Sequence, residues 1–169
     1  MKVDFRQIKP EGTEFRFLES TEELDLVVEG VEFPAPIEVE LVGTKTGDEL
    51  IFQGTITTKA ELECARCLDN FESVLTSKMQ FVIHLIEISQ PQESDDDDFV
   101  VLPKTTQEYD IGQRVREAII LELPLKPLCS ESCLGLCPMC GVNLNDTDCD
   151  CTPDKTDERW ESLRQLFEE

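Results

Sequence analysis

Residues 50–64 read LIFQGTITTKAELEC and alternate apolar or small side chains with polar ones at every second position. A strand that buries one face has this period of two, because successive side chains point to opposite faces of a sheet. Gly54 interrupts the apolar series and predicts a bend or a β-bulge at that point. The stretch therefore predicts one long, half-buried strand that ends at Cys64.

Alternating runs also flank this strand. Ile37, Val39 and Leu41 alternate with glutamates before it, and residues 43–48, GTKTGD, predict the turn of a hairpin. After it the apolar side chains fall on odd positions, which are Phe71, Leu75, Met79, Phe81, Ile83 and Leu85. Residues 13–88 are therefore predicted to be mainly strands of an antiparallel sheet, with Cys64 and Cys67 at the tip between two of them.

A linker and then a helix follow this region. Residues 89–98, SQPQESDDDD, predict a solvated linker, because four consecutive aspartates lack the ligand spacing of a calcium loop. From about residue 110 to residue 123 apolar residues recur at intervals of three and four, with Asp110 as the expected N-cap and Pro124 as the stop. The apolar face, which should cover one face of the sheet, comprises Ile111, Val115, Ala118, Ile119 and Leu123.

Together these elements predict an α+β fold. It consists of a mainly antiparallel β-sheet or open barrel with one covering helix, followed by a cysteine-rich zinc-knuckle module and a short terminal helix. That last helix is expected from about Asp157, because Trp160, Leu163 and Phe167 fall on one helical face. We expect a β-rich domain over residues 1–128 and the cysteine-rich module over residues 129–169.

Eight cysteines supply the candidate chemistry. Cys64 and Cys67 form a C-x2-C pair, and six more lie within 23 positions, at Cys129, Cys133, Cys137, Cys140, Cys149 and Cys151. Each C-x2-C pair can supply two corners of a tetrahedral metal site, and ligands that are all sulfur favour zinc in a structural role. The eight cysteines therefore predict two structural Zn²⁺ ions.

The spacing favours one division of these ligands. Residues 137–141, CPMCG, form a zinc-knuckle pattern, in which Gly141 permits a positive φ in the turn. Cys149 and Cys151 follow closely enough to complete that site. The second site would then join Cys64, Cys67, Cys129 and Cys133 and fasten the module to the strand tip. In the rival arrangement, one zinc binds within the C-terminal six and the other cysteines remain plain thiols.

Other sulfur chemistries remain open at this point. Eight cysteines could form disulfides, and four could hold an iron–sulfur cluster. The alternative function is a thiol-disulfide or redox-sensing protein, because Cys137-Pro138-Met139-Cys140 has the C-P-x-C form of thiol oxidoreductases. That chemistry needs a helix beginning at the first cysteine, and Gly141-Val142-Asn143 is a poor helix start.

No catalytic constellation is recognisable in the sequence. A catalytic zinc keeps an open coordination position, whereas four thiolates close the site. His84 is the one histidine, and it shares a strand phase with Val82 and Ile86, which predicts a partly buried strand residue rather than a base. There is no Gly-rich phosphate loop. We therefore expect no enzymatic activity and no small-molecule substrate.

The charge and the apolar runs bear on partners and compartment. The net charge is −22, and no basic stripe is visible, so bare nucleic acid should be repelled and a basic protein partner is favoured. No apolar run approaches the roughly 20 residues of a membrane span, and the first residues contain no signal-peptide run. A reducing, cytosolic environment is expected, in which clustered cysteines bind metal more readily than they cross-link.

An ordered set of motifs is similar to the YceD family, over about residues 15–151. These are Glu63-Cys64-Ala65-Arg66-Cys67-Leu68, then Leu123-Pro124-Leu125, then Cys129-x3-Cys133-x-Gly135-Leu136-Cys137-Pro138-x-Cys140-Gly141-x-Asn143-Leu144-Asn145, and finally Cys149-Asp150-Cys151. The family consists of bacterial and plastid proteins described as large ribosomal RNA subunit accumulation proteins. The resemblance implies a role in the accumulation or processing of 23S rRNA, and hence in large-subunit biogenesis.

Read with the charge, this resemblance predicts how the chain works. A strongly acidic protein suits a basic partner, such as a ribosomal protein or an rRNA-processing factor, better than extensive contact with rRNA itself. The cationic side chains that could touch a partner or RNA locally are Arg66, Arg114, Arg116 and Lys126. The implied compartment is the bacterial cytoplasm, or the plastid stroma for a plant protein.

Overall fold

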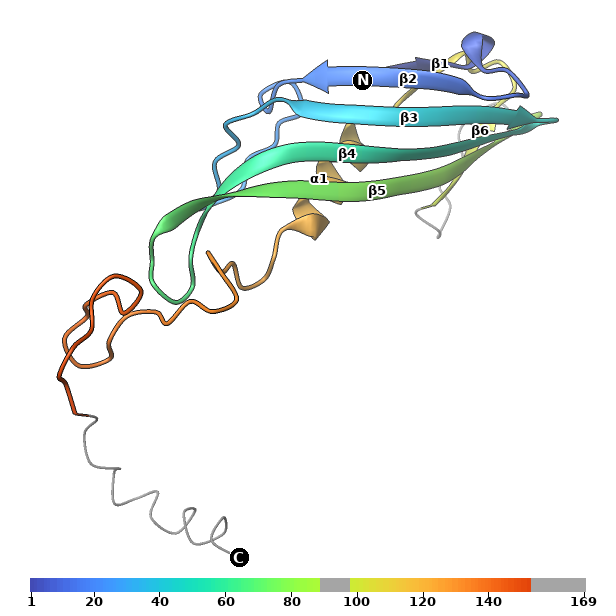
Figure 1. Ribbon diagram of the computed structural model, residues 1–169. Helices are drawn as coiled ribbons and strands as arrows, with labels where there is room; N and C mark the ends of the chain where they lie inside the picture. Colours follow the sequence, from blue (N-terminus) through green and yellow to red (C-terminus); the bar gives the residue numbers. More distant parts are fainter. Residues whose placement is uncertain (89–97, 153–169) are drawn as a thin grey trace, which may run out of the picture.

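The computed structural model describes residues 1–88 and 98–152. Its main element is a five-stranded sheet in the order β2-β3-β4-β5-β6 (Figure 1). The strands are β2 (Thr13–Glu19), β3 (Ile37–Thr46), β4 (Glu49–Glu63), β5 (Asn70–Ile86) and β6 (Phe99–Pro103). Neighbours from β2 to β5 are antiparallel, and β6 is parallel to β5.

A smaller layer packs against this sheet. It contains the two-stranded sheet of β1 (Lys2–Asp4) and β7 (Glu108–Asp110), the 3-10 helix η1 (Phe5–Gln7) and the helix α1 (Gly112–Glu122). The helix lies across one face of the large sheet and packs on β5 and β4 (Figure 1). The predicted fold, a mainly antiparallel sheet with one covering helix, is confirmed; the sheet is open, with β2 and β6 at its ends.

The core follows the alternation seen in the sequence. Even positions of β4 and odd positions of β5 point to the covered face, where Phe52 and Phe81 are fully buried and stack with their ring centroids 4.7 Å apart. From α1, Val115 and Ile119 reach the same core. Burying each such side chain contributes about 1.5–3 kcal/mol, so this face supplies most of the driving force for folding.

Two local expectations about the strands are only partly correct. Gly54 causes no bulge, because it pairs in unbroken register with Leu41 on one side and Met79 on the other. It is needed for close approach instead, since a Cβ atom there would lie 2.4 Å from the backbone oxygen of Glu40. The hairpin turn is also shorter than residues 43–48, because β3 extends to Thr46 and only Gly47 and Asp48 separate the strands.

The helix start also differs from the expectation. The N-cap is Ile111 rather than Asp110, although the Asp110 carboxylate still accepts a hydrogen bond of 2.8 Å from the backbone N–H of Gly112. A carboxylate so placed satisfies one of the free N–H groups of the first turn. The expected terminal helix and residues 89–97 of the acidic linker lie outside the described residues, and the boundary after residue 128 stays a prediction.

Candidate metal centres

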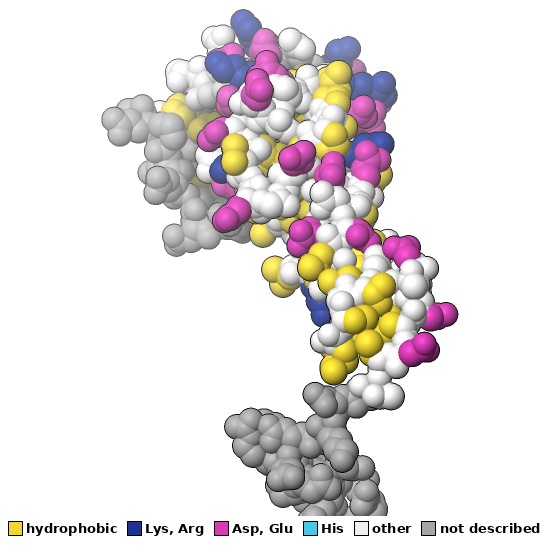
Figure 2. Space-filling model, turned by 90° about the vertical axis from the view of Figure 1, so that its left-hand side faces the viewer, with side chains coloured by type: hydrophobic (Ala, Val, Ile, Leu, Met, Phe, Trp, Pro, Cys, Tyr) yellow, Lys and Arg dark blue, Asp and Glu magenta, His cyan; other side chains and the backbone are white. Residues whose placement is uncertain are grey.

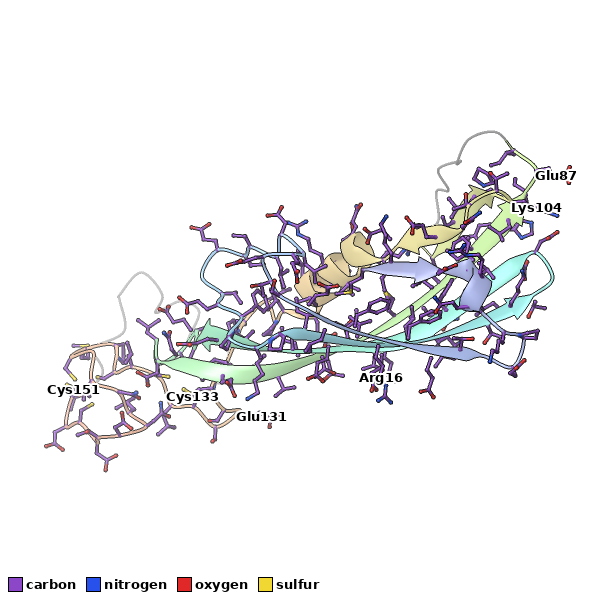
Figure 3. The ribbon with its side chains drawn as sticks, turned by 90° about the horizontal axis from the view of Figure 1, so that it is seen from above. Arg16, Glu87, Lys104, Glu131, Cys133 and Cys151 are labelled. Carbon is purple, nitrogen blue, oxygen red and sulfur yellow. The ribbon has the colours of Figure 1, made fainter. Side chains whose placement is uncertain are left out.

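The tip of the β4–β5 hairpin meets the chain that leaves the helix. The last pair of the hairpin, Glu63 with Asn70, brings the loop 64–69 to the end of the sheet. The segment after α1 returns alongside this loop, where Ala65 N–H donates to Pro127 O over 2.8 Å. Cys133 and Cys151 consequently lie at one end of the molecule and Glu87 and Lys104 at the other (Figure 3).

Four sulfurs converge where the loop and the returning segment meet. The Sγ atoms of Cys64, Cys67, Cys129 and Cys133 all lie within 4.8 Å of one another. The Sγ of Cys64 is 3.8 Å from that of Cys133, and the Sγ of Cys67 is 3.7 Å from that of Cys129. Cys64, Cys67 and Cys133 are buried and form a small cluster with Phe71 and Leu128, whereas Cys129 is exposed.

These distances suit a tetrahedral zinc site. Zn–S bonds of about 2.3 Å at the tetrahedral angle place neighbouring sulfurs about 3.8 Å apart. A disulfide needs about 2.05 Å, so sulfurs at 3.7 and 3.8 Å are too far apart to be bonded. The four thiols therefore fit a metal ion better than they fit a pair of disulfides.

A second group of four lies in the C-terminal module. The Sγ atoms of Cys137, Cys140, Cys149 and Cys151 also lie within 4.8 Å of one another, and Cys137 is the buried member. The sulfurs thus form the two groups that the spacing favours, rather than one group with four thiols left over. Metal binding by all eight stays a prediction, for which these groups supply the ligands.

The two C-x2-C turns have the same conformation. The N–H two residues beyond the first cysteine points at its sulfur, over 3.5 Å from Arg66 to Cys64 and 3.4 Å from Met139 to Cys137. The N–H four residues beyond it donates to the carbonyl of the first cysteine, over 2.9 Å in each turn. Amides directed at sulfur in this way stabilise thiolates, as zinc knuckles require.

The first cysteine of each turn, Cys64 and Cys137, is poised as an anion. The backbone N–H of Cys67 lowers the pKa of Cys64 to about 6, and that of Cys140 does the same for Cys137. The neighbouring Cys140 sulfur, by contrast, raises the pKa of Cys151 to about 12. Crowded sulfurs resist further loss of protons because thiolates repel one another, and a divalent cation would relieve that repulsion.

One position in these turns gives a stability prediction. The residue four beyond the first cysteine has a positive φ in both, +62° at Leu68 and +75° at Gly141. Since a leucine there is strained and 55% exposed, Leu68→Gly should raise the free energy of unfolding by about 0.5–1 kcal/mol. The reverse change, Gly141→Ala, should lower it by about 1 kcal/mol. Denaturant unfolding of both variants measures the pair, and a loss of stability in Leu68→Gly would contradict the strain.

Two asparagines connect the groups of sulfurs, and the sequence analysis missed their role. Asn145, from the loop of the second group, directs its side-chain amide at the Cys133 sulfur of the first, over 3.4 Å, and accepts from Leu134 N–H over 2.8 Å. Asn143 donates to Asp69 at the hairpin tip over 2.6 Å. The signal was their place in the Asn143-Leu144-Asn145 motif, directly after the knuckle. Hydrogen bonds to ligand sulfurs orient and tune a metal site.

The four cationic residues nominated as partner contacts are differently placed. Arg66 Nη1 donates to the carbonyls of Glu131 and Cys133, over 3.2 and 2.8 Å, and so ties the hairpin tip to the module. Arg114 lies over the Phe81 ring at 4.9 Å, and Arg116 donates to Asp25 O. Lys126 is exposed in the returning segment. Their role as partner contacts stays a prediction, and the structure does not bring the four together.

A groove of about 770 Å³ lies beside the first group of sulfurs. It runs between the end of β4, residues 28–32 and the segment 123–127. Its apolar lining consists of Val28, Val31, Leu62, Leu123, Pro124 and Pro127. Four carboxylates also line it, those of Glu29, Glu32, Glu61 and Glu63, and none of them forms an ion pair with any described residue. The groove is therefore strongly acidic.

The module itself forms a lobe beyond the sheet. Figure 2 shows apolar side chains, cysteine included, gathered on the face of this lobe in view. Exposed apolar residues of the tip and the module include Leu68, Leu134 and Met139. No helix begins at Cys137, because residues 138–140 form a turn, and this does not favour the redox reading of the C-P-x-C motif.

The remaining expectations about the site concern His84 and membrane spans. His84 lies in β5 with a side chain 35% exposed, its Nδ1 3.5 Å from Glu49 and its ring near Phe99, as expected for a partly buried strand residue. Among the described residues, no helix is both long and apolar enough to cross a membrane.

Comparison with known proteins points to one family. The family described as "Large ribosomal RNA subunit accumulation protein YceD" matches residues 52–167. Proteins described as chloroplastic homologues of this protein are similar to the chain: the Arabidopsis thaliana one is 27% identical over 79% of this chain and 49% of its own length. The Zea mays one is 30% identical over 73% of this chain and 51% of its own length.

A mycobacterial relative is similar to the chain to about the same degree. An uncharacterized protein of Mycobacterium leprae is 30% identical over 72% of this chain and 54% of its own length. The chain thus spans about half the length of these curated relatives. No solved structure shows significant similarity to it. The family match covers more than half of the chain, and although it lacks the first strands it includes both groups of cysteines. The chain therefore belongs to the YceD family of large ribosomal RNA subunit accumulation proteins.

Proposed function

We propose that this chain is a non-catalytic zinc-binding factor that supports the accumulation of 23S rRNA and so the biogenesis of the large ribosomal subunit. It acts through a basic protein, either a ribosomal protein or an rRNA-processing factor. The family description and the names of the two plant relatives support the pathway. The observation that carries the molecular part is the convergence of eight cysteines into two groups of four.

The ligand sets favour a structural rather than a catalytic metal. Cys64, Cys67, Cys129 and Cys133 would hold one Zn²⁺ ion, and Cys137, Cys140, Cys149 and Cys151 the other. Zinc with four thiolates is coordinatively closed and has no position for water or substrate. When bound, it supplies a cross-link and neutralises part of the thiolate charge. The residues around it then hold the acidic groove and the module in fixed positions.

Metal analysis tests this part of the proposal. We expect two zinc ions per chain by elemental analysis or native mass spectrometry, and no fast-reacting thiol in the loaded protein. The redox alternative predicts a low-pKa thiol at Cys137 that reacts quickly with a thiol reagent in the protein as purified. Finding such a thiol, with no zinc at the second group, would overturn the proposal in favour of that alternative.

Charge supports a basic partner. At a net charge of −22 the chain repels phosphate, so long-range attraction acts on basic proteins instead. The groove combines apolar lining with four glutamates that form no ion pair within the described part of the chain, which suits a segment that carries both lysine or arginine and an apolar side chain. Ribosomal proteins are a class of partner with that composition.

Capture from a lysate, with and without ribonuclease, tests the partner. We expect ribosomal proteins to be recovered after ribonuclease treatment, and recovery to fall when Glu29, Glu32, Glu61 and Glu63 are all replaced by glutamine. The matched control replaces four exposed glutamates elsewhere, Glu11, Glu22, Glu38 and Glu122, and so makes the same change in net charge. If recovery instead disappears with ribonuclease and depends on Arg66, the chain contacts RNA and the protein partner is wrong.

A further inference from the structure

The strand β5 is paired on both sides over only part of its length. β4 pairs with it from His84 to Asn70, whereas β6 pairs with it only over Val82–Ile86. On the side away from β4, residues 70–81 therefore have no strand beside them within the described chain. In Figure 1 this stretch forms the free border of the sheet, next to the end that bears the cysteines.

The backbone groups of this border can be assigned from the pairing further along. Val82 N–H donates to Asp98 O and Ile86 O accepts from Lys104 N–H, so even residues of β5 direct their backbone groups away from β4. Leu85 N–H donates to Asp48 O on the β4 side, which gives odd residues the opposite direction. Because these directions alternate along a strand, the N–H and C=O groups of Glu72, Val74, Thr76, Lys78 and Gln80 point outward from the sheet.

Nothing in this stretch protects the edge. Residues 70–81, NFESVLTSKMQF, contain neither proline nor glycine, and their register with β4 is unbroken. Natural sheets usually blunt such an edge with proline, a bulge or a covering segment, since it is a template for another strand. Here Val74 is also 61% exposed. The outward backbone groups of this edge can therefore form hydrogen bonds with another strand.

The sequence of the edge is complementary to itself. When the strand is laid antiparallel against a second copy so that Leu75 faces Leu75, Glu72 lies opposite Lys78 and Val74 opposite Thr76 on the exposed face. On the covered face the same register sets Phe71 opposite Met79 and Ser73 opposite Ser77, and Asn70 meets Gln80 at the ends. Opposite charges and matched polar or apolar pairs directly across a ladder stabilise a sheet.

Only the register centred on Leu75 sets even residues against even ones and also places Glu72 opposite Lys78. The outward-pointing groups belong to even residues, so a ladder must set even residues against even ones. A shift that sets Val74 against Val74 puts Glu72 opposite Thr76, and one that sets Thr76 against Thr76 puts Glu72 opposite Gln80 and Val74 opposite Lys78. Neither pairs the two charges. Lys78 has no ion pair among the described residues, so it is available to a second copy. Glu72 already pairs with Lys59 of β4 over 2.7 Å, and its carboxylate would then lie between two lysines.

We propose that two copies of this chain pair along residues 70–80 of β5, antiparallel and centred on Leu75, to join their five-stranded sheets into one continuous sheet. A two-fold dimer needs an interface that is complementary to itself, and this edge is complementary to itself in the Leu75 register. The partner is therefore a second copy of the chain.

Sedimentation of the purified full chain tests the proposal, from micromolar to submillimolar concentration. The buffer contains about 0.15 M salt, because the repulsion between two negatively charged copies is then screened beyond about 8 Å. We expect a monomer–dimer equilibrium. Thr76→Pro removes an outward N–H that β4 does not use, so it should abolish the dimer and keep the thermal melt, since proline is tolerated on an edge. Thr76→Ala keeps the N–H and should still dimerise.

Charge exchange tests the register. Lys78→Glu and Glu72→Lys should each weaken the homodimer at least about tenfold, because like charges then face each other on both sides of the axis. An equimolar mixture of the two variants restores opposite charges in every pair and should form heterodimers. If the mixture associates no better than either variant alone, the register is wrong.

Hydrogen exchange supplies a residue-level measurement. The amides of Val74, Thr76 and Lys78 should gain protection as concentration rises, while those of Leu75 and Ser77, already bonded to β4, should not change. A chain that stays monomeric throughout the concentration range overturns the proposal. So does a Thr76→Pro variant that leaves the oligomeric state unchanged but loses ribosomal proteins in the lysate capture, because the edge then serves another protein.

Discussion

Replacing Cys64 and Cys67 together with serine is expected to lower the metal content from two ions per chain to one and to release the module from the sheet. Serine hydroxyls do not hold zinc, and this group of sulfurs is the buried contact between the hairpin tip and residues 129–133. Structural zinc contributes roughly 10–16 kcal/mol of apparent binding free energy in small peptides, so its loss outweighs the remaining hydrogen bonds.

Two amides report the release directly. Ala65 N–H donates to Pro127 O and Leu136 N–H to Arg66 O, so both bonds span the contact. Their protection from hydrogen exchange should fall at least tenfold, or by about 1.4 kcal/mol of opening free energy. The control replaces Cys149 and Cys151 with serine, which removes the other ion and should leave both amides protected. An equal loss of amide protection in the two variants would show that the first group of sulfurs does not hold the module to the sheet.

Gly54→Ala is expected to cost about 3 kcal/mol of unfolding free energy, at the upper end for an added methyl group. The new Cβ would lie 2.4 Å from Glu40 O and 3.0 Å from Leu41 Cα, both backbone atoms. Backbone in the middle of a sheet cannot move aside without breaking the ladder between β3 and β4. The Leu41 Cδ1 atom would also lie 2.9 Å from the new Cβ, but this side chain can rotate away, so the two backbone atoms determine the cost.

A thermal melt measures this effect against a neighbouring control. For a domain of this size, 3 kcal/mol corresponds to a fall in Tm of about 6–12 °C. Thr55→Ala removes atoms from the next residue of the same strand, on the other face, and should cost no more than about 1 kcal/mol. A Gly54→Ala variant that melts within a degree or two of the wild type would mean that the strands are more widely spaced than described.

The long strands could be predicted because burial on one face imposes its period on the sequence. Phe52 and Ile56 on β4, and Phe81 and Ile83 on β5, belong to uninterrupted alternations, and each is buried. β6 was not predicted because Phe99–Pro103 is short and does not alternate. Its place in the sheet depends on pairing with β5, which the local sequence does not reveal. β1 and β7 are three residues each, and their pairing joins distant parts of the chain.

The cysteine groups could be predicted as far as spacing determines them. Two C-x2-C pairs supply four ligands, and the closely spaced Cys129 with Cys133 and Cys149 with Cys151 supply the other four. This spacing was enough to favour the division of the eight sulfurs into two sets of four. Leu68 could not be foreseen, because leucine gives no sign of a left-handed turn and only the geometry shared with Gly141 reveals it. The role of the asparagines was not predicted either. Whether a side chain reaches a sulfur of the other group depends on how the module folds back against the hairpin tip.

The separation of the first group of sulfurs along the chain has a consequence for protein synthesis. Cys67 and Cys129 are 62 residues apart, although their sulfurs lie side by side. At about 5–20 residues per second, a ribosome takes roughly 3–12 s to add the intervening chain. For that time the hairpin tip presents two thiols without their partners. The nascent chain is then most exposed to oxidants and to competing metals. With zinc as the proposed ligand of this group, we expect the supply of free zinc during translation to affect how much of the protein matures.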